Sequence, residues 1–204
     1  MKPIKKLCLL IQIVLIPCRV QAQGTFVYDQ QSSDEGHPGE TIRGIQVSEP
    51  IGQSFTPSLS AVGFIRLELG DVNVGNGLGA TIYLNLRTNS ITGPIMGTTD
   101  PVFLPDGFGG FTNFFFSVPV SVTPGMTYYF RPEVQLGDAW VIGRFVPNYP
   151  GGTEYANGQP GVNDLWFREG IYVVPEPSGL ALVGCGIVIC GLRRRMKRRN
   201  PCDP

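Results

Sequence analysis

Short apolar segments separated by Gly, Pro or Asn run through residues 23–174 and limit what this chain can fold into. Their β-branched and aromatic residues favour strands, and no window of eleven or more residues has the 3.6-residue period of a helix. Spacings of about 10–15 residues are typical of an all-β sandwich. The 27 Gly and 18 Pro among 204 residues also disfavour long helices. We expect a single β-sandwich domain with strands within residues 25–28, 51–56, 62–69, 80–87, 102–104, 113–118, 126–134, 139–145 and 164–168.

Alternation of apolar and polar residues predicts which side chains face the core. Residues 62–69 and 80–87 alternate, and the residues expected on one face of each strand are Ile65, Leu67, Leu69, Ile82, Leu84 and Leu86. Residues 113–118 form a continuous apolar run, which suits a strand covered on both faces. We therefore expect core positions for Phe114, Phe115 and Phe116, and also for Trp166.

A tight turn is expected at residues 121–125, where Gly125 is free to take a positive φ. Pro119 is expected just past the end of a strand, where the missing N–H costs little. Two hydrophobic strands joined in this way favour a jelly-roll-like antiparallel sandwich over a barrel.

Charge and cysteine divide the chain into three segments. Residues 23–174 contain six Arg, no Lys and fourteen Asp or Glu, a formal charge of −8, although the whole chain is neutral. An acidic surface repels phosphate backbones, so we expect no nucleic-acid partner. All five Cys lie in the two ends of the chain. The central domain therefore lacks a disulfide framework, a thiolate nucleophile and a zinc–thiolate site.

Residues 1–22 have the pattern of a secretory signal peptide. The positive stretch MKPIKK is followed by the apolar run LCLLIQIVLIPC, and VQA precedes Gln23 at the expected cleavage site. An uncleaved signal anchor is the alternative, but the short apolar run favours cleavage.

Residues 174–204 have the pattern of a second targeting segment. The stiff polar sequence VPEPS is followed by an uncharged, Gly-rich apolar run at residues 178–192, which predicts a short transmembrane helix. This run is shorter than the roughly 20 residues needed to cross a bilayer without tilting. A basic stop follows, and by the positive-inside rule it stays cytoplasmic, which places residues 23–174 outside the cytoplasmic membrane. The basic residues are Arg193, Arg194, Arg195, Lys197, Arg198 and Arg199.

The order of Pro175-Glu176-Pro177, a short apolar run and a terminal Arg cluster resembles the PEP-CTERM sorting signal of Gram-negative bacteria. The resemblance covers roughly the last 30 residues of the chain. It implies recognition by an exosortase, a membrane-embedded cysteine transpeptidase, with Pro175, Glu176 and Pro177 as recognition residues. It also implies a precursor in the cytoplasmic membrane that is delivered to the cell surface or an extracellular matrix, often with exopolysaccharide. PCDP, after Asn200, extends past the usual basic end.

Residues 51–135 loosely resemble the carbohydrate-binding-like sandwich modules of secreted bacterial proteins. The resemblance rests on GQSFT, a strand and hairpin, and the pattern PxxxxPGxxYYF at residues 119–130. Aromatic rings with a polar edge suit stacking on a sugar, and loops on sandwiches often carry binding sites. The aromatic residues that we single out as candidate glycan contacts are Tyr149, Tyr155 and Trp140.

Catalytic chemistry has few candidate residues in this chain. His37 is the single histidine and lies in the polar loop SSDEGHPGE, and no G-x-S-x-G elbow is present. We therefore expect a solvated loop histidine and no catalytic residue. Paired carboxylates remain an alternative, because a glycosidase needs two of them across a cleft. The acids considered for this role are Asp34, Glu35, Glu40, Asp164 and Glu169.

A candidate calcium site lies in the sequence DVNVGNG at residues 71–77. Asp71, Asn73 and Asn76 place oxygen ligands in a flexible loop, as calcium prefers. The loop lacks the later bidentate Glu of an EF-hand, and an ordinary Asn/Gly hairpin connection is the alternative. We expect no other cofactor.

The sequence thus predicts a signal peptide at residues 1–22, a β-sandwich at 23–173 and a sorting signal at 174–204. The leading hypothesis is an exported, non-enzymatic surface or matrix protein that is a candidate glycan binder. Its expected partners are the export machinery, an exosortase, the cytoplasmic membrane through residues 178–192, and exopolysaccharide. The alternatives are a secreted polysaccharide hydrolase that uses paired carboxylates and a calcium-stabilised adhesion module.

Overall fold

The computed structural model describes residues 24–147 and 149–174, which contain fourteen β-strands and one 3-10 helix, η1 (Gln46–Ser48). The predicted leader, the motif Pro175–Pro177, the apolar run 178–192 and the basic stop at 193–199 lie outside these residues. No helix in the described ranges has the length and apolar character needed to span a bilayer.

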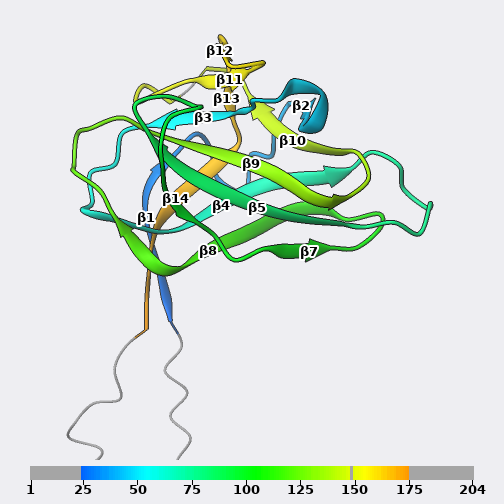
Figure 1. Cartoon of the computed structure of the whole chain (residues 1–204), viewed down its shortest axis with the longest axis horizontal. Helices are drawn as coiled ribbons and strands as arrows, with labels where there is room; N and C mark the ends of the chain where they lie inside the picture. Colours follow the sequence, from blue (N-terminus) through cyan, green and yellow to red (C-terminus); the bar gives the residue numbers. More distant parts are fainter. Residues whose placement is uncertain (1–23, 148, 175–204) are drawn as a thin grey trace, which may run out of the picture. The chain divides into compact units, whose positions relative to one another are not determined.

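The strands form two antiparallel sheets stacked face to face (Figure 1), which confirms the predicted all-β, sandwich-like fold. Sheet A consists of β1 (Thr25–Gln31), β14 (Phe167–Val173), β4 (Ala61–Asp71), β10 (Trp140–Phe145) and β13 (Asp164–Leu165), with β2 (Thr41–Gly44) on β10 and β8 (Gly109–Ser121) on β4. Sheet B consists of β12 (Gln159–Pro160), β11 (Glu154–Ala156), β3 (Gly52–Phe55), β9 (Tyr128–Gly137), β5 (Ala80–Thr88) and β6 (Ile95–Thr98), with β7 (Val102–Leu104) on β5.

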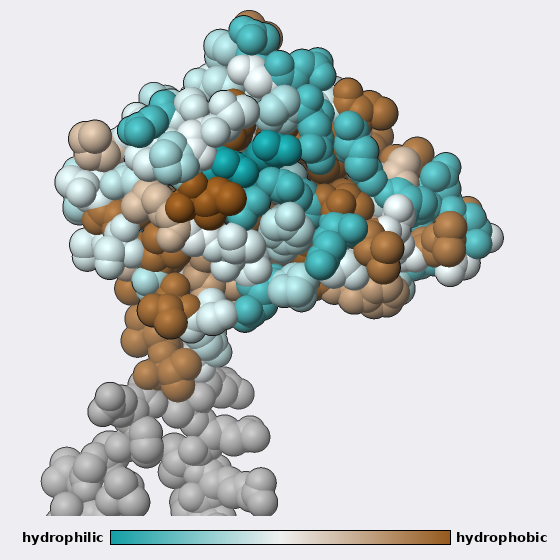
Figure 2. Space-filling model, viewed as in Figure 1, coloured by the Kyte–Doolittle hydropathy of each residue, from teal (hydrophilic) through white to brown (hydrophobic). Residues whose placement is uncertain are grey.

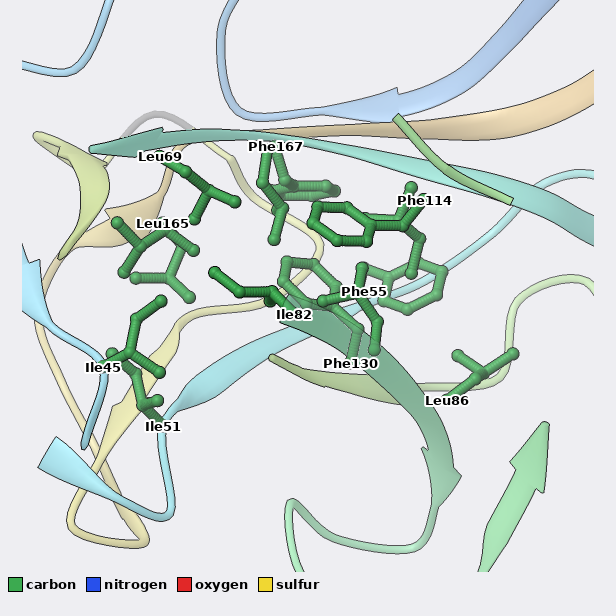
Figure 3. Packing of buried hydrophobic residues seen from close by; sticks show 14 of the residues in the cluster. Ile45, Ile51, Phe55, Leu69, Ile82, Leu86, Phe114, Phe130, Leu165 and Phe167 are labelled. Atoms are coloured by element: carbon green, nitrogen blue, oxygen red, sulfur yellow. The ribbon is translucent and has the colours of Figure 1, made fainter. Parts of the chain in front are cut away.

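The hydrophobic core lies between the two sheets, where side chains from β3, β4, β5, β8, β9 and β14 interdigitate (Figure 3). Alternation places every second residue of β4 and β5 in this core, as predicted. Ile65, Leu67, Ile82, Leu84 and Leu86 are fully buried, and Leu69 is nearly so. Trp166 is also fully buried, but it lies outside this cluster, where its Nε1 donates to the His37 carbonyl.

Two features of β8 differ from the prediction. Phe114 and Phe116 are buried against the core, but Phe115 points to the opposite face and is 36% exposed. The run of three Phe is therefore covered by the second sheet on one side only. Pro119 lies inside β8, close to the register shift between Val62 and Phe64 of β4, and not past the strand end. A shifted register removes the need for a ladder hydrogen bond there.

The turn after β8 is as predicted, because Gly125 has a φ of +80° and the Met126 N–H donates to the Thr123 carbonyl. The strands that the sequence did not indicate are short or polar: β2, β6, β11 and β12. Tertiary pairing with longer strands holds these segments extended, since their own residues have no clear alternation. The strand predicted at residues 164–168 is divided at Trp166 into β13 and β14, and β14 continues to Val173, beyond the predicted end.

Candidate functional site

The outer face of sheet B carries three half-buried tyrosines, Tyr83 on β5, Tyr129 on β9 and Tyr155 on β11. Tyr83 and Arg87 alternate with core residues of β5, and Arg87 lies directly opposite Tyr129. Side chains opposite one another in an antiparallel pair share a face, so these residues point away from the core. Tyr155 packs edge-to-face on Tyr129, with ring centroids 5.6 Å apart. We call this surface the tyrosine face: Tyr83, Asn85, Arg87, Tyr129, Arg131, Glu133 and Tyr155.

A network of paired charges occupies the middle of the tyrosine face. Glu133 accepts a hydrogen bond from Asn85 Nδ2 at 2.8 Å, and its carboxylate lies 3.5 Å from both the Arg87 and the Arg131 guanidinium. Arg131 also donates to Glu49 at 2.8 Å. Two arginines therefore balance two carboxylates, which leaves the face polar and locally neutral. In Figure 2, hydrophilic residues gather over β5 and β9.

A shallow depression of about 460 Å³ adjoins this network. Tyr83 and Asn85 line one side of it, and Ile95, Thr98, Thr99, Pro101 and Gln135 line the rest. The Thr98 hydroxyl donates to Asn85 Oδ1 at 2.7 Å, which fixes the amide with its Nδ2 toward Glu133. A ligand would thus meet hydroxyl, amide and aromatic groups that are already held in place.

Two tyrosines of the face, Tyr83 and Tyr155, have a raised pKa and remain protonated over the physiological pH range. Burial, and next the negative charge of Glu133, raise the pKa of Tyr83 above its ordinary value. Burial, followed by contact with Tyr129, raises the pKa of Tyr155. These two phenols keep their protons, and the Tyr83 phenol donates to Glu133 Oε2 at 3.3 Å, while the rings offer flat apolar surfaces. The arrangement is suited to binding a polyhydroxylated, uncharged ligand.

The structure separates the three aromatic residues that the sequence singled out. Tyr155 lies on the tyrosine face, but Trp140 is fully buried and Tyr149 is 8% exposed, and both belong to the core. Tyr149 packs on Phe167 and accepts a hydrogen bond from the Thr56 N–H at 2.9 Å. A buried ring has no free face for a sugar, so the contacts predicted for Trp140 and Tyr149 are wrong.

The carboxylates considered for catalysis do not meet across an open cleft. Asp164 and Glu169 are 1% and 0% exposed, and neither reaches solvent. The shallow depression beside Tyr83 and Asn85 is not lined by an Asp or Glu. A second depression, of about 600 Å³ between β6 and β8, is not lined by one either.

The polar loop before β2 holds the other acids that we considered for catalysis. His37 is exposed, and its Nδ1 lies 2.9 Å from Asp34. The Ser33 hydroxyl donates to the His37 carbonyl and not to its ring. Glu35 lies 2.9 Å from the Arg66 guanidinium, and Glu40 is exposed. These contacts stabilise the conformation of the loop. They do not place the Ser33 hydroxyl against the His37 ring, as a catalytic nucleophile would require.

The candidate calcium loop is held by hydrogen bonds within the protein. Asp71 accepts from the N–H groups of Asn73 and Gly107, both at 2.8 Å. Asn76 Nδ2 donates to Asp138 at 2.6 Å, and its oxygen accepts from the Leu78 N–H. Among the described residues, no group of three or more His, Cys, Asp or Glu side chains could hold a metal ion. The geometry is that of a self-bonded hairpin connection, and calcium here stays a prediction.

Sequence reasoning missed most of the tyrosine face. The pattern that could have revealed it lies in the segment ATIYLNLR, where Tyr83, Asn85 and Arg87 alternate with apolar residues. The same alternation in residues 129–133 places Tyr129, Arg131 and Glu133 together. What the sequence did not show is that these two strands pair and that Tyr155 joins them from a segment distant in the chain.

The comparisons with known proteins leave the family of this chain open: no protein-family model matches it, and no curated protein matches it.

Proposed function

We propose that this chain is an exported, non-enzymatic surface or matrix protein whose sandwich binds a neutral glycan on the tyrosine face. The observation that carries the binding proposal is the combination of three half-buried tyrosines with an internally neutralised polar network on the outer face of one sheet. Tyrosine rings stack on the apolar faces of sugar rings, and the fixed amide and hydroxyl groups match sugar hydroxyls. An uncharged ligand is favoured because the arginines already have carboxylate partners.

The sorting proposal rests on the sequence of the chain's ends. The signal-peptide pattern, Pro175-Glu176-Pro177, the apolar run and the basic stop together support export, membrane retention and exosortase processing. The bounds of the sandwich support the sorting proposal, because β1 begins at Thr25 and β14 ends at Val173. Cleavage after residue 22 and near residue 175 would therefore remove no strand. We also propose that residues 178–192 form the short transmembrane helix that holds the precursor.

A jelly-roll-like topology is the finer fold proposal. Its support is that the chain crosses between the two sheets from one long strand to the next. The strands β3, β5 and β9 belong to sheet B, and β4, β8 and β14 belong to sheet A. Strands that alternate between two packed sheets in this way are typical of a jelly roll. We propose this class for residues 24–174.

A binding screen tests the glycan proposal. Purified residues 23–174 would be titrated with neutral and anionic polysaccharides, including the exopolysaccharide of the producing cell. Tyr129→Ala and Tyr155→Ala should each weaken binding by about 2- to 12-fold, the effect of losing one aromatic contact. Tyr172→Ala is the matched control, because Tyr172 is a partly exposed tyrosine of sheet A. Equal losses in all three variants, or binding confined to anionic polymers, would contradict the proposal.

A second experiment tests the sorting proposal independently of any ligand. Replacing Pro175 and Pro177 with Ala should leave the full-length precursor in the cytoplasmic membrane, because the recognition motif is lost. The measurement is the size and fractionation of the chain in cells that contain an exosortase. Unchanged processing and release of the double variant would show that the motif is not the signal.

A further inference from the structure

A second group of aromatic side chains lies outside the core, on the outer face of sheet A. Phe26 of β1 packs on Phe64 of β4 and on Tyr172 of β14, each with ring centroids 4.9 Å apart. Phe115 of β8 lies 5.7 Å from Tyr172 and 6.2 Å from Phe64, and Tyr28 lies 5.5 Å from Phe64. We call these five residues the aromatic patch. Phe64 is fully buried although it belongs to the outer face, because the other four rings cover it.

The other half of this sheet face is covered by the protein itself. The loop at residues 33–40 folds over it, where Trp166 Nε1 donates to the His37 carbonyl and Glu35 pairs with Arg66. No segment among residues 24–147 and 149–174 covers the patch in this way, and Phe115 and Tyr172 remain 36% and 39% exposed. Charged groups border the patch: Arg168 stacks 3.4 Å above the Tyr28 ring, and Asp100 accepts from Ser117 at the β8 edge.

The position of the patch in the chain identifies what would cover it. Tyr172 precedes Ser178, the first residue of the apolar run, by six residues. An extended chain spans at most about 3.6 Å per residue, so the patch stays within roughly 20 Å of the start of that run. Val173 and Val174, which lead toward it, are themselves 43% and 57% exposed. Figure 2 shows hydrophobic residues gathered where β1 begins and β14 ends.

We infer that the aromatic patch rests in the lipid interface of the cytoplasmic membrane while the precursor is anchored. Phe and Tyr rings partition into the headgroup region, and a bordering Arg can pair with anionic headgroups. The inference rests on the membrane anchoring proposed above. It goes beyond that proposal because it assigns a lipid-facing side to the sandwich and leaves the tyrosine face, on the opposite sheet, directed to glycan.

Reporter tryptophans test the contact in the full chain. Phe115→Trp places a reporter in the patch, and Phe103→Trp is the control, because Phe103 is 67% exposed on β7 of sheet B. Both variants are reconstituted in vesicles of phosphatidylethanolamine and phosphatidylglycerol that carry brominated acyl chains. We expect bromine to quench the Phe115→Trp signal at least about twofold more than the Phe103→Trp signal. Tyr172→Trp is the second patch reporter, for the case in which Phe115→Trp does not fold.

Vesicle flotation separates failure of the contact from failure of the anchor. A chain that floats with vesicles but shows equal quenching at the patch and at Phe103 overturns the lipid contact while the anchor stands. A chain that does not float overturns the anchor, and with it the contact. Shielding of the patch from a soluble quencher without any effect of bromine indicates a protein or glycan occupant and also overturns the inference.

Discussion

Glu169 is the most unusual single residue of the sandwich. It lies opposite the core residue Ile65 on β4 and is fully buried. Among the described residues, no hydrogen bond of good geometry reaches either carboxyl oxygen, although the Gln30 backbone and the Asp29 carboxyl lie close to it. Burial, and next the charge of Asp29, raise the pKa of Glu169 to about 9. A charged carboxylate in such a place is very costly, so the residue is protonated at neutral pH.

This burial predicts a specific pH dependence of stability. The folded chain keeps a proton that the unfolded chain, with a carboxyl pKa near 4.5, releases, so stability falls as pH rises from about 4.5 to 9. Glu169→Gln has no such proton, and we expect its stability advantage over the parent to grow by up to about 1.4 kcal/mol per pH unit in this window. Urea unfolding at several pH values measures the difference.

Glu40→Gln is the control for this prediction, since Glu40 is exposed and its carboxyl stays in water. It reports the effect of exchanging a carboxyl for an amide at a site without burial. A constant difference between Glu169→Gln and the parent from acidic to alkaline pH would show that Glu169 is not buried in its neutral form.

At the scale of elements, one ion cluster joins the two sheets at their shared end. Glu154 of β11 in sheet B is 1% exposed and accepts from both Nε and Nη2 of Arg144, the first at 2.7 Å. Arg43 of β2 lies 3.3 Å from the same carboxylate. Because β10 and β2 belong to sheet A, this bidentate pair fixes the position of β11 against the opposite sheet.

Removing the buried carboxylate should therefore loosen this end of the sandwich. Glu154→Ala leaves two guanidinium groups without their partner, and we expect a loss of about 3–5 kcal/mol in unfolding free energy. The matched control is Glu35→Ala, because Glu35 pairs with Arg66 and Arg168 at a more exposed site. That variant should lose no more than about 1 kcal/mol. Chemical denaturation measures both, and equal losses would contradict a special role for the buried pair.

At the scale of the whole molecule, the thermal stability of the sandwich tests the alternative of a calcium-stabilised adhesion module. Asp71 and Asp106 direct their carboxylates at backbone N–H groups of Asn73, Gly107, Gly75 and Gly77, so the loop is held without an ion. We expect the melting temperature of residues 23–174 to be the same in calcium and in chelator. Calorimetry under both conditions measures it. A melting temperature that rises with calcium, and does so less in Asp71→Asn, would instead support the adhesion module.

The sequence by itself determined the class of this fold. Apolar residues at every second position, as in residues 65–69 and 80–87, bury one face as a strand, and frequent Gly and Pro disfavour long helices. These are local properties, because each depends on residues within a few positions of one another. The turn at Gly125, the burial of Trp166 and the core position of Phe114 were predictable for the same reason.

The tertiary structure decided which aromatic residues are accessible. Local alternation divides side chains between two faces but does not say which face the second sheet covers. Trp140 therefore lies in the core, while Phe115 lies outside it and joins rings from β1, β4 and β14. The tyrosine face likewise exists only because β5, β9 and β11 meet in one sheet, although Tyr83 and Tyr155 are far apart in the chain. Pairing of distant strands is a long-range property, and a single sequence does not reveal it.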